Sequence, residues 1–201
     1  MAGPASRKEL SHERIVEAAA RAIRREGYAG VGVADVMKEA GLTHGGFYAH
    51  FPSRDAMLAA AMERAGRDGA ARMAQGMARR QAEGASPLRA MVESYLSDRM
   101  LVSCETGCPI SALASEMPRQ SAEVRAASAA RVQGLVRALQ QALPATAGEH
   151  AAMAITANLV GAMQLARALG DNAEGRAMLA AARQSILDPV SYTHLTLPTK
   201  A

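Results

Sequence analysis

The chain has 201 residues, of which 49% are hydrophobic and 3% aromatic, and a formal net charge of +4 at pH 7. This length allows one or two domains, and the apolar fraction is enough for a sizeable core. Two cysteines are too few for a disulfide framework, and residues 1–20 lack the continuous apolar stretch of a signal peptide. We therefore expect a cytoplasmic protein.

The positive charge is concentrated near the N-terminus. Residues 1–80 hold 13 Lys and Arg against 9 Asp and Glu, whereas residues 81–201 hold 10 of each kind. An excess of positive charge at one end suits contacts with DNA phosphates. Charge alone leaves a second interpretation open, which is a solvated surface with a chance imbalance.

The first elements predict an all-α fold, because Ala is a strong helix former and β-branched runs are few. We expect a helix capped by Ser11 and stopped by Gly27, with a buried stripe at every third or fourth position. The stripe consists of Ile15, Ala18, Ala19, Ala22 and Ile23.

Two short helices are predicted next, over residues 33–40 and 44–50, with Thr43 as the cap of the second. Gly41-Leu42 makes the tight turn between them. This arrangement behind a longer helix is a helix-turn-helix, whose second short helix reaches the base edges of DNA. Ser53 can cap the following helix, which is expected to run to about Arg80.

Further helices are predicted along the rest of the chain, over residues 88–96, 109–116, 120–143, 148–169 and 173–187. The most apolar segment, residues 150–169, contains Asn158, Gln164 and Arg167, so we expect it to be buried in protein rather than in lipid. Residues 190–201 carry no helical stripe and are interpreted as a disordered or foreign tail.

The segment GLTHGGFYAHFPSRDAML, residues 41–58, resembles the signature of the TetR family of repressors. The positions that carry the resemblance lie between about residues 12 and 62, and they are Gly27, Tyr28, Val33, Gly41, Thr43, Phe47, Tyr48, His50 and Phe51. The chain departs from the pattern at Val31 and Gly32, where the family usually has Thr or Ser. The resemblance implies a three-helix DNA-binding domain over residues 1–55 and a helical effector-binding and dimerisation domain over 56–189.

The expected DNA-binding residues lie in and beside the second short helix. They are Thr43, His44, Gly45, Gly46, Tyr48, His50 and Arg54. Tyr48 can donate its hydroxyl to a phosphate, and the residues at the helix N-terminus face the groove. Two glycines inside a helix cost about 1 kcal/mol each, which a close approach of the backbone to DNA would explain. Phe47 and Phe51 are expected in the core.

The resemblance also implies an effector cavity in the second domain. Its candidate lining residues are Met91, Tyr95, Met100, Met117, Met153 and Met163, although such side chains more often form ordinary core. Cys108 precedes Pro109, which favours the first position of a helix, so its thiol could be activated at a helix cap. Cys104 could then resolve an oxidised Cys108. The alternative is that both thiols are small buried hydrophobes.

A homodimer is predicted from the two long helices over residues 120–143 and 148–169, which are apolar on more than one face. The expected interface residues are Val132, Leu135, Val136, Leu139, Leu159, Met163 and Ala166. Two such pairs of helices would form a four-helix bundle and place two recognition helices about one DNA turn apart.

The function predicted from these features is a transcriptional repressor, released from double-stranded operator DNA by a small-molecule or thiol-reactive effector. No metal site, cofactor, membrane partner or catalytic set is expected. Two alternatives stay open. One is a helical scaffold that has lost DNA binding, as the departures at Val31 and Gly32 would allow. The other is a thiol oxidoreductase, although the spacing of Cys104 and Cys108 is not the C-x-x-C of that chemistry.

Overall fold

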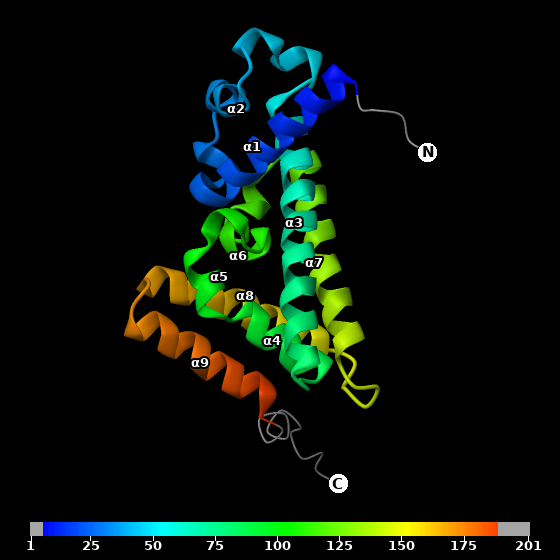
Figure 1. Cartoon of the computed structure of the whole chain (residues 1–201), viewed down its shortest axis with the longest axis vertical. Coiled ribbons are helices and arrows are strands. Elements are labelled where there is room, and N and C mark those ends of the chain that lie inside the picture. Colours follow the sequence, from blue (N-terminus) through cyan, green and yellow to red (C-terminus); the bar gives the residue numbers. More distant parts are fainter. Residues whose placement is uncertain (1–5, 189–201) are drawn as a thin grey trace. The chain divides into compact units, whose positions relative to one another are not determined.

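The computed structural model describes residues 6–188, and every regular element among them is a helix (Figure 1). The chain divides into two compact units. Unit 1 combines Met1–Ala71 with Ser103–Gly134, and unit 2 combines Arg72–Val102 with Leu135–Ala201. The sequence predicts a boundary between a DNA-binding and an effector-binding domain at residues 55 and 56. The two units are defined by packing contacts instead, so the functional boundary stays a prediction. The predicted tail, residues 190–201, lies outside the described residues.

Unit 1 contains the N-terminal helices and a segment from the middle of the chain. Its elements are α1 (Arg7–Gly30), α2 (Val33–Glu39), η1 (His44–Ala49), the first part of α3 (Arg54–Ala82), η2 (Cys104–Thr106), α6 (Pro109–Leu113), η3 (Met117–Arg119) and the first part of α7 (Ala122–Ala142). Helix α1 packs against α2, η2 and α6. The middle segment therefore belongs to the same packed body as the helix-turn-helix.

Helix α1 starts earlier than predicted. The cap is Ser6, whose hydroxyl accepts from the Glu9 N–H while the Glu9 carboxylate accepts from the Ser6 N–H. Ser11 cannot form such a reciprocal capping box, because the residue three positions after it is Arg14 rather than Glu or Gln. The predicted stripe of Ala and Ile is buried, as expected.

Gly27 interrupts α1, as the sequence predicts. Its φ of 75° is left-handed, a conformation that favours glycine. Three residues then continue the helix to Gly30 before α2 begins. After α2, Gly41 makes the tight turn with a φ of 66°, and the Leu42 N–H donates to the Met37 carbonyl at 2.9 Å. The turn predicted at Gly41-Leu42 is therefore present.

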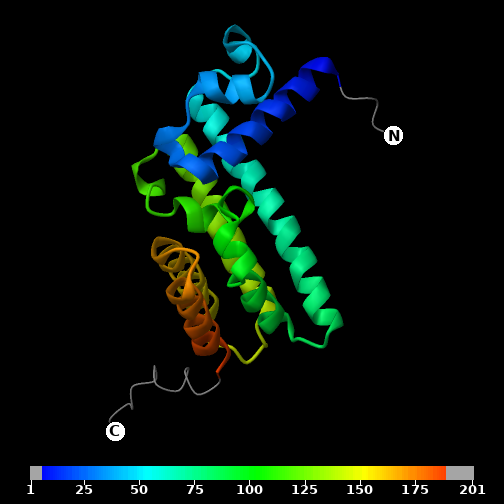
Figure 2. The ribbon, with the colours of Figure 1, turned by 60° about the vertical axis from the view of Figure 1, so that its left-hand side comes forward.

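Unit 2 contains the rest of α3 and α7 with α4 (Pro87–Tyr95), α5 (Asp98–Val102), α8 (Ala151–Leu169) and α9 (Ala173–Leu187). Helices α8 and α9 lie side by side and form its most extensive pairing (Figure 2). The Asn172 side chain caps α9 by accepting from the Gly175 N–H at 3.0 Å. Gly175 has no room for a Cβ, because the Gly170 and Ala166 carbonyls lie against it. That contact keeps the α8–α9 turn tight.

Helix α8 is long and apolar enough, by length and composition, to cross a membrane. Its buried residues recur at helical spacing and pack within unit 2. They are Ala152, Ile155, Thr156, Leu159, Val160, Ala162, Met163 and Ala166. Thr156 satisfies its hydroxyl by donating to the Ala152 carbonyl at 2.7 Å. These contacts are those of a core helix, as the sequence predicts for this segment.

Candidate DNA-binding site

The second helix of the helix-turn-helix, η1, is anchored on one side and exposed on the other. Phe47 is 1% exposed, stacks on Phe51 with ring centroids 5.8 Å apart and meets the Tyr48 ring edge-on at 5.2 Å. Tyr48 is 75% exposed. An apolar anchor therefore fixes the helix while the neighbouring phenol points to solvent, where a DNA phosphate could be reached.

Two glycines give η1 a bare surface. A Cβ placed on Gly45 would meet no atom within 4 Å, and one on Gly46 would make ordinary contacts with Met37 and Thr43. Neither glycine is therefore required by packing in the free protein. Thr43 stands at the N-cap position, but its side chain makes no cap bond; its backbone carbonyl instead accepts from the Gly46 N–H at 3.0 Å. The element is a 3-10 helix, tighter than the α-helix expected.

His50 follows η1 and lies beside α1. The His12 ring stacks on Phe51 at 4.6 Å and lies 6.1 Å from the His50 ring. Burial lowers the pKa of His50, and the nearby charges of His12 and Lys8 lower it further. His50 Nδ1 is buried and has no hydrogen-bond partner among the described residues. An approaching phosphate would supply the negative charge that this cluster lacks.

Unlike the other predicted DNA-binding residues, Arg54 donates hydrogen bonds to the backbone at the end of α1. Its Nε donates to the Val31 carbonyl at 3.1 Å, and a terminal nitrogen donates to the Tyr28 carbonyl. The guanidinium thus spans the end of α1 and the residue after it. Sequence reasoning assigned Arg54 to DNA because the family signature has a basic residue there, and it missed the two carbonyls that the fold brings within reach.

The comparison with protein families decides the class of this protein. Residues 15–61 match the sequence model of the bacterial regulatory proteins of the tetR family. The matched stretch runs from α1 through α2 and η1 into α3. The chain carries the DNA-binding domain of the TetR-family transcriptional regulators.

Similar proteins agree with this assignment. The regulator is 29% identical over 171 residues to an uncharacterised HTH-type transcriptional regulator found in two strains of Mycobacterium tuberculosis, which covers 79% of this chain and 85% of that protein. The reduced form of NemR from E. coli superposes with a TM-score of 0.72 at 20% identity, over 89% of this chain and 95% of NemR. A TetR regulator from Chloroflexus aurantiacus gives 0.69 at 22% identity, over 89% and 93%. The two structures show the shared fold.

The family also decides the general biochemistry. TetR-family members are DNA-binding regulators rather than enzymes, and they bind operator DNA and act as dimers with small-molecule effectors. The alternative of a thiol oxidoreductase therefore has no support. No group of His, Cys, Asp or Glu within residues 6–188 could hold a metal ion.

The predicted effector-pocket residues of the regulator are divided between the two units, and their role in a pocket stays a prediction. Met117 belongs to unit 1, and the other five belong to unit 2. Met91, Tyr95 and Met163 are buried, Met100 is half-buried, and Met153 is 59% exposed. The burial of Met91, Tyr95 and Met163 is that of residues packed in the core.

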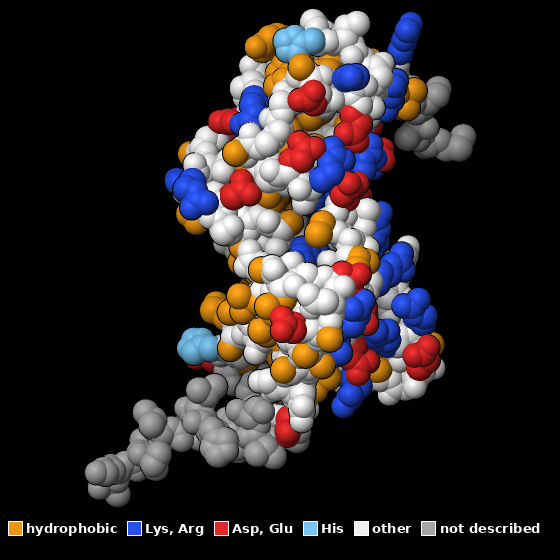
Figure 3. Space-filling model, turned by 90° about the vertical axis from the view of Figure 1, so that its left-hand side faces the viewer, with side chains coloured by type: hydrophobic (Ala, Val, Ile, Leu, Met, Phe, Trp, Pro, Cys, Tyr) orange, Lys and Arg blue, Asp and Glu red, His pale blue; other side chains and the backbone are white. Residues whose placement is uncertain are grey.

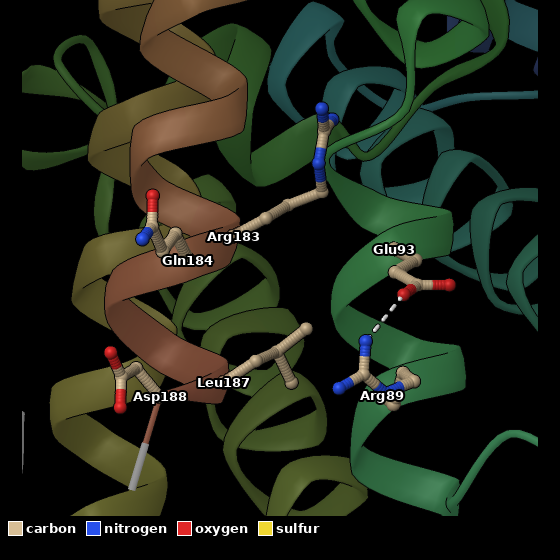
Figure 4. A pocket seen from close by; sticks show the side chains of 6 residues that line it. All are labelled: Arg89, Glu93, Arg183, Gln184, Leu187 and Asp188. Carbon is tan, nitrogen blue, oxygen red and sulfur yellow. Dashed lines mark hydrogen bonds and ion pairs between the residues drawn. The ribbon is translucent and has the colours of Figure 1, made fainter. Parts of the chain in front are cut away.

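A cavity that sequence reasoning missed lies in unit 2 between α4 and α9 (Figure 4). It has a volume of about 370 Å³ and is lined by Arg89, Glu93, Arg183, Gln184, Leu187 and Asp188. Arg89 pairs with Glu93 at 3.1 Å, and Arg183 donates to the Leu96 carbonyl. The lining is polar and open, so it differs from the apolar, Met-lined pocket expected. No local motif signals it, because its residues come from helices about 90 positions apart in the sequence.

Both cysteines are free and half-buried. Cys108 is the N-cap residue of α6, directly before Pro109, as predicted, but its side chain makes no cap bond. Cys104 begins η2. The segment between them reaches α1, since the Gly107 carbonyl accepts from Arg24 at 3.4 Å.

The predicted interface residues are mostly turned into the chain. Leu139, Leu159, Met163 and Ala166 are buried within a single copy, and Val132, Leu135 and Val136 are half-buried. The core of unit 2 uses the apolar stripe of α8 that the sequence assigned to a partner. The large apolar side chains of α8 that stay exposed are Met153, Leu165 and Leu169. Figure 3 shows hydrophobic side chains gathered on one face of unit 2.

Proposed function

We propose that this regulator is a cytoplasmic, homodimeric repressor that reads operator DNA with η1. The observation that carries the proposal is the contrast between the buried Phe47 and the exposed Tyr48 on a helix with an open glycine surface. Such a helix can lie close against a DNA groove without losing its own anchor. Thr43 and His44, exposed at its N-terminal end, are the groups proposed to meet the base edges.

The proposed phosphate contacts are Tyr48 and His50. Helix η1 carries no Lys or Arg, so base readout would rest on His44, the Thr43 hydroxyl and methyl contacts. The positive charge of residues 1–80 would supply a general attraction to the duplex. Arg54 is proposed to support the site indirectly, because two of its nitrogens already donate to the Val31 and Tyr28 carbonyls.

Selection of a duplex from random-sequence DNA tests the proposal directly. The full-length regulator should enrich one sequence, expected to be two-fold symmetric if a dimer binds. Its affinity should fall steeply as salt is raised. Tyr48→Phe should weaken binding by about 1 kcal/mol on any sequence, as the loss of one phosphate hydrogen bond would. A matched melting curve should be unchanged, because the hydroxyl is exposed.

The alternative function, a helical scaffold that does not bind DNA, predicts a different outcome. No duplex would be enriched, and the Tyr48→Phe change would have no effect on any binding activity. A duplex bound with the same affinity at low and high salt would also count against the proposed phosphate contacts.

The dimer is proposed to form through the exposed side of α8, with Met153, Leu165 and Leu169 among the covered residues. Exposed side chains of this kind on a core helix are typical of a surface that a second copy covers. The half-buried Val132, Leu135 and Val136 of α7 are proposed to flank this contact. Sedimentation at micromolar concentration should give twice the chain mass.

Release by an effector is proposed to act through unit 2, with the α4–α9 cavity and the buried Met91 and Met163 as places where a ligand could alter packing. A thiol-reactive effector is the second candidate. It is favoured by one observation, the contact of the Cys104–Cys108 segment with α1 through Arg24 and Gly107. Mild oxidation should then weaken operator binding by the native regulator but not by Cys108→Ser.

A further inference from the structure

Tyr28 is held at three atoms by three separate elements. Its backbone N–H donates to the Glu116 carboxylate at 2.9 Å, and its backbone carbonyl accepts from Arg54. Its phenol, 1% exposed, makes a hydrogen bond of 3.0 Å with Ser128. Burial raises the pKa of the Tyr28 phenol, so the hydroxyl stays protonated and can donate.

The contact with Glu116 lies at the kink of α1. Gly27 has a left-handed φ of 75°, and a Cβ there would collide with the Glu116 carboxylate. The backbone angle favours glycine, and a larger residue there would also displace the Glu116 carboxylate from its present position. The Glu116 carboxylate accepts from the Tyr28 N–H, which the kink leaves without its regular i−4 partner in the helix.

The same middle segment touches α1 at two further places. Arg24 is 5% exposed and donates to the Gly107 carbonyl at 3.4 Å and to the Ala65 carbonyl at 3.5 Å. Arg25 pairs with Glu105 at 3.4 Å, and both of those side chains are partly exposed. The last part of α1 is thus bonded along one side to the segment from Glu105 to Glu116.

The chain path gives these contacts a consequence. Segment Ser103–Gly134 packs in unit 1, but the chain enters it from unit 2 at Val102 and returns to unit 2 at Leu135. Any rearrangement in unit 2 that displaces either end acts on this segment through covalent bonds. Tyr28 is bonded both to this segment and, through Arg54, to the start of α3, directly beside η1 in the sequence.

We propose that Tyr28 is the junction that couples segment Ser103–Gly134 to the helix-turn-helix, with Glu116 and Ser128 as positioning residues for DNA binding. Glu116 and Ser128 set the position of Tyr28, and Tyr28 with Arg54 sets how the end of α1 meets α2 and α3. The inference rests on the proposed function, since it names how that DNA site is regulated. The coupling can be tested without knowing the effector. Because linkage is reciprocal, DNA binding must alter the segment if the segment alters DNA binding.

The experiment compares variants of the full-length regulator on the duplex selected from random-sequence DNA. Glu116→Ala should weaken binding by about tenfold and speed amide exchange at Tyr28 by a similar factor, as loss of a hydrogen bond to a charged group would. Glu116→Gln should stay within about threefold of the native affinity, because the amide oxygen still accepts. Glu105→Gln is the matched control and should bind like the native protein, since its ion pair is exposed.

Amide exchange measured with and without the duplex tests the coupling itself. In the native protein, DNA should slow exchange across residues 104–119, and Glu116→Ala should abolish that slowing. A purely structural role would lower the melting temperature yet leave this DNA-dependent protection intact. Faster exchange at Tyr28 with unchanged DNA affinity would overturn the proposal, and so would equal losses for the Ala and Gln variants.

A second set of variants keeps the proposal testable if Glu116→Ala does not fold. Tyr28→Phe and Ser128→Ala should each weaken duplex binding, and the double variant should be no weaker than either single one, because both remove one bond. Additive losses would overturn the junction. If the native regulator enriches no duplex at all, the proposed function fails, whereas a duplex that binds without protecting residues 104–119 refutes only the coupling.

Discussion

Arg54→Met separates the two roles that sequence and structure assign to this arginine. The half-buried side chain donates from Nε to the Val31 carbonyl at 3.1 Å and from a terminal nitrogen to the Tyr28 carbonyl. A hydrogen bond to a charged donor contributes about 1.5–3 kcal/mol in buried sites, and partial exposure reduces that figure. We expect a loss of about 2 kcal/mol in the free energy of unfolding for the two bonds together, which lowers the melting temperature by about 4–8 °C in a protein of this size.

The salt dependence of DNA binding provides the second measurement. Removal of a phosphate contact would reduce the slope of log affinity against log salt by about 0.9, whereas removal of a supporting side chain leaves the slope unchanged. We expect the slope of Arg54→Met to equal that of the native regulator, with a uniformly lower affinity.

The matched control is Arg67→Met on the same helix. Arg67 is exposed, and its pairing distance to Glu63 is 3.9 Å, so its loss should change neither the melting temperature nor the affinity by a measurable amount. A slope reduced by about 0.9 in Arg54→Met, with an unaltered melting temperature, would refute the supporting role and return Arg54 to the phosphate backbone.

Further predictions concern the recognition helix, the dimer and pH. Gly45→Ala should raise stability slightly, by about 0.5 kcal/mol, because the site is open in the free protein; gel shifts with the selected duplex should nevertheless show weaker binding, and unchanged binding would mean that η1 does not approach DNA closely. Leu165→Glu should shift sedimentation toward the monomer, because a charge on a covered apolar surface is costly, while unit 2 stays folded; an unaffected dimer would place the interface elsewhere. The folded-state pKa of His50 is below its ordinary value, so the unfolded chain binds more protons near pH 6 and His50 should make stability fall as pH falls through that range. A phosphate would raise the same pKa, so operator affinity should instead increase as pH falls from 8 to 6, and His50→Gln should flatten both pH profiles.

The helical content and the DNA-binding motif could be predicted from sequence because both depend on local patterns. The stripe from Ile15 to Ile23, the punctuation at Gly27 and Gly41, and the apolar Phe47 and Phe51 each act within a few positions of the chain. The predicted cap of α1 at Ser11 was wrong, because only Ser6 has Glu at the third position after it and forms a capping box.

Only the tertiary structure decided which distant segments form hydrogen bonds with one another. Tyr28 and Ser128 are 100 positions apart, and no local pattern pairs a phenol with that hydroxyl or a carboxylate with the Tyr28 N–H. The same holds for the face of α8 that stays exposed. Its sequence is apolar nearly all round, and packing within unit 2 buries Leu159 and Met163 while Leu165 stays at the surface. Periodicity identifies apolar positions, but which neighbour covers them depends on contacts between elements that the one-dimensional pattern does not contain.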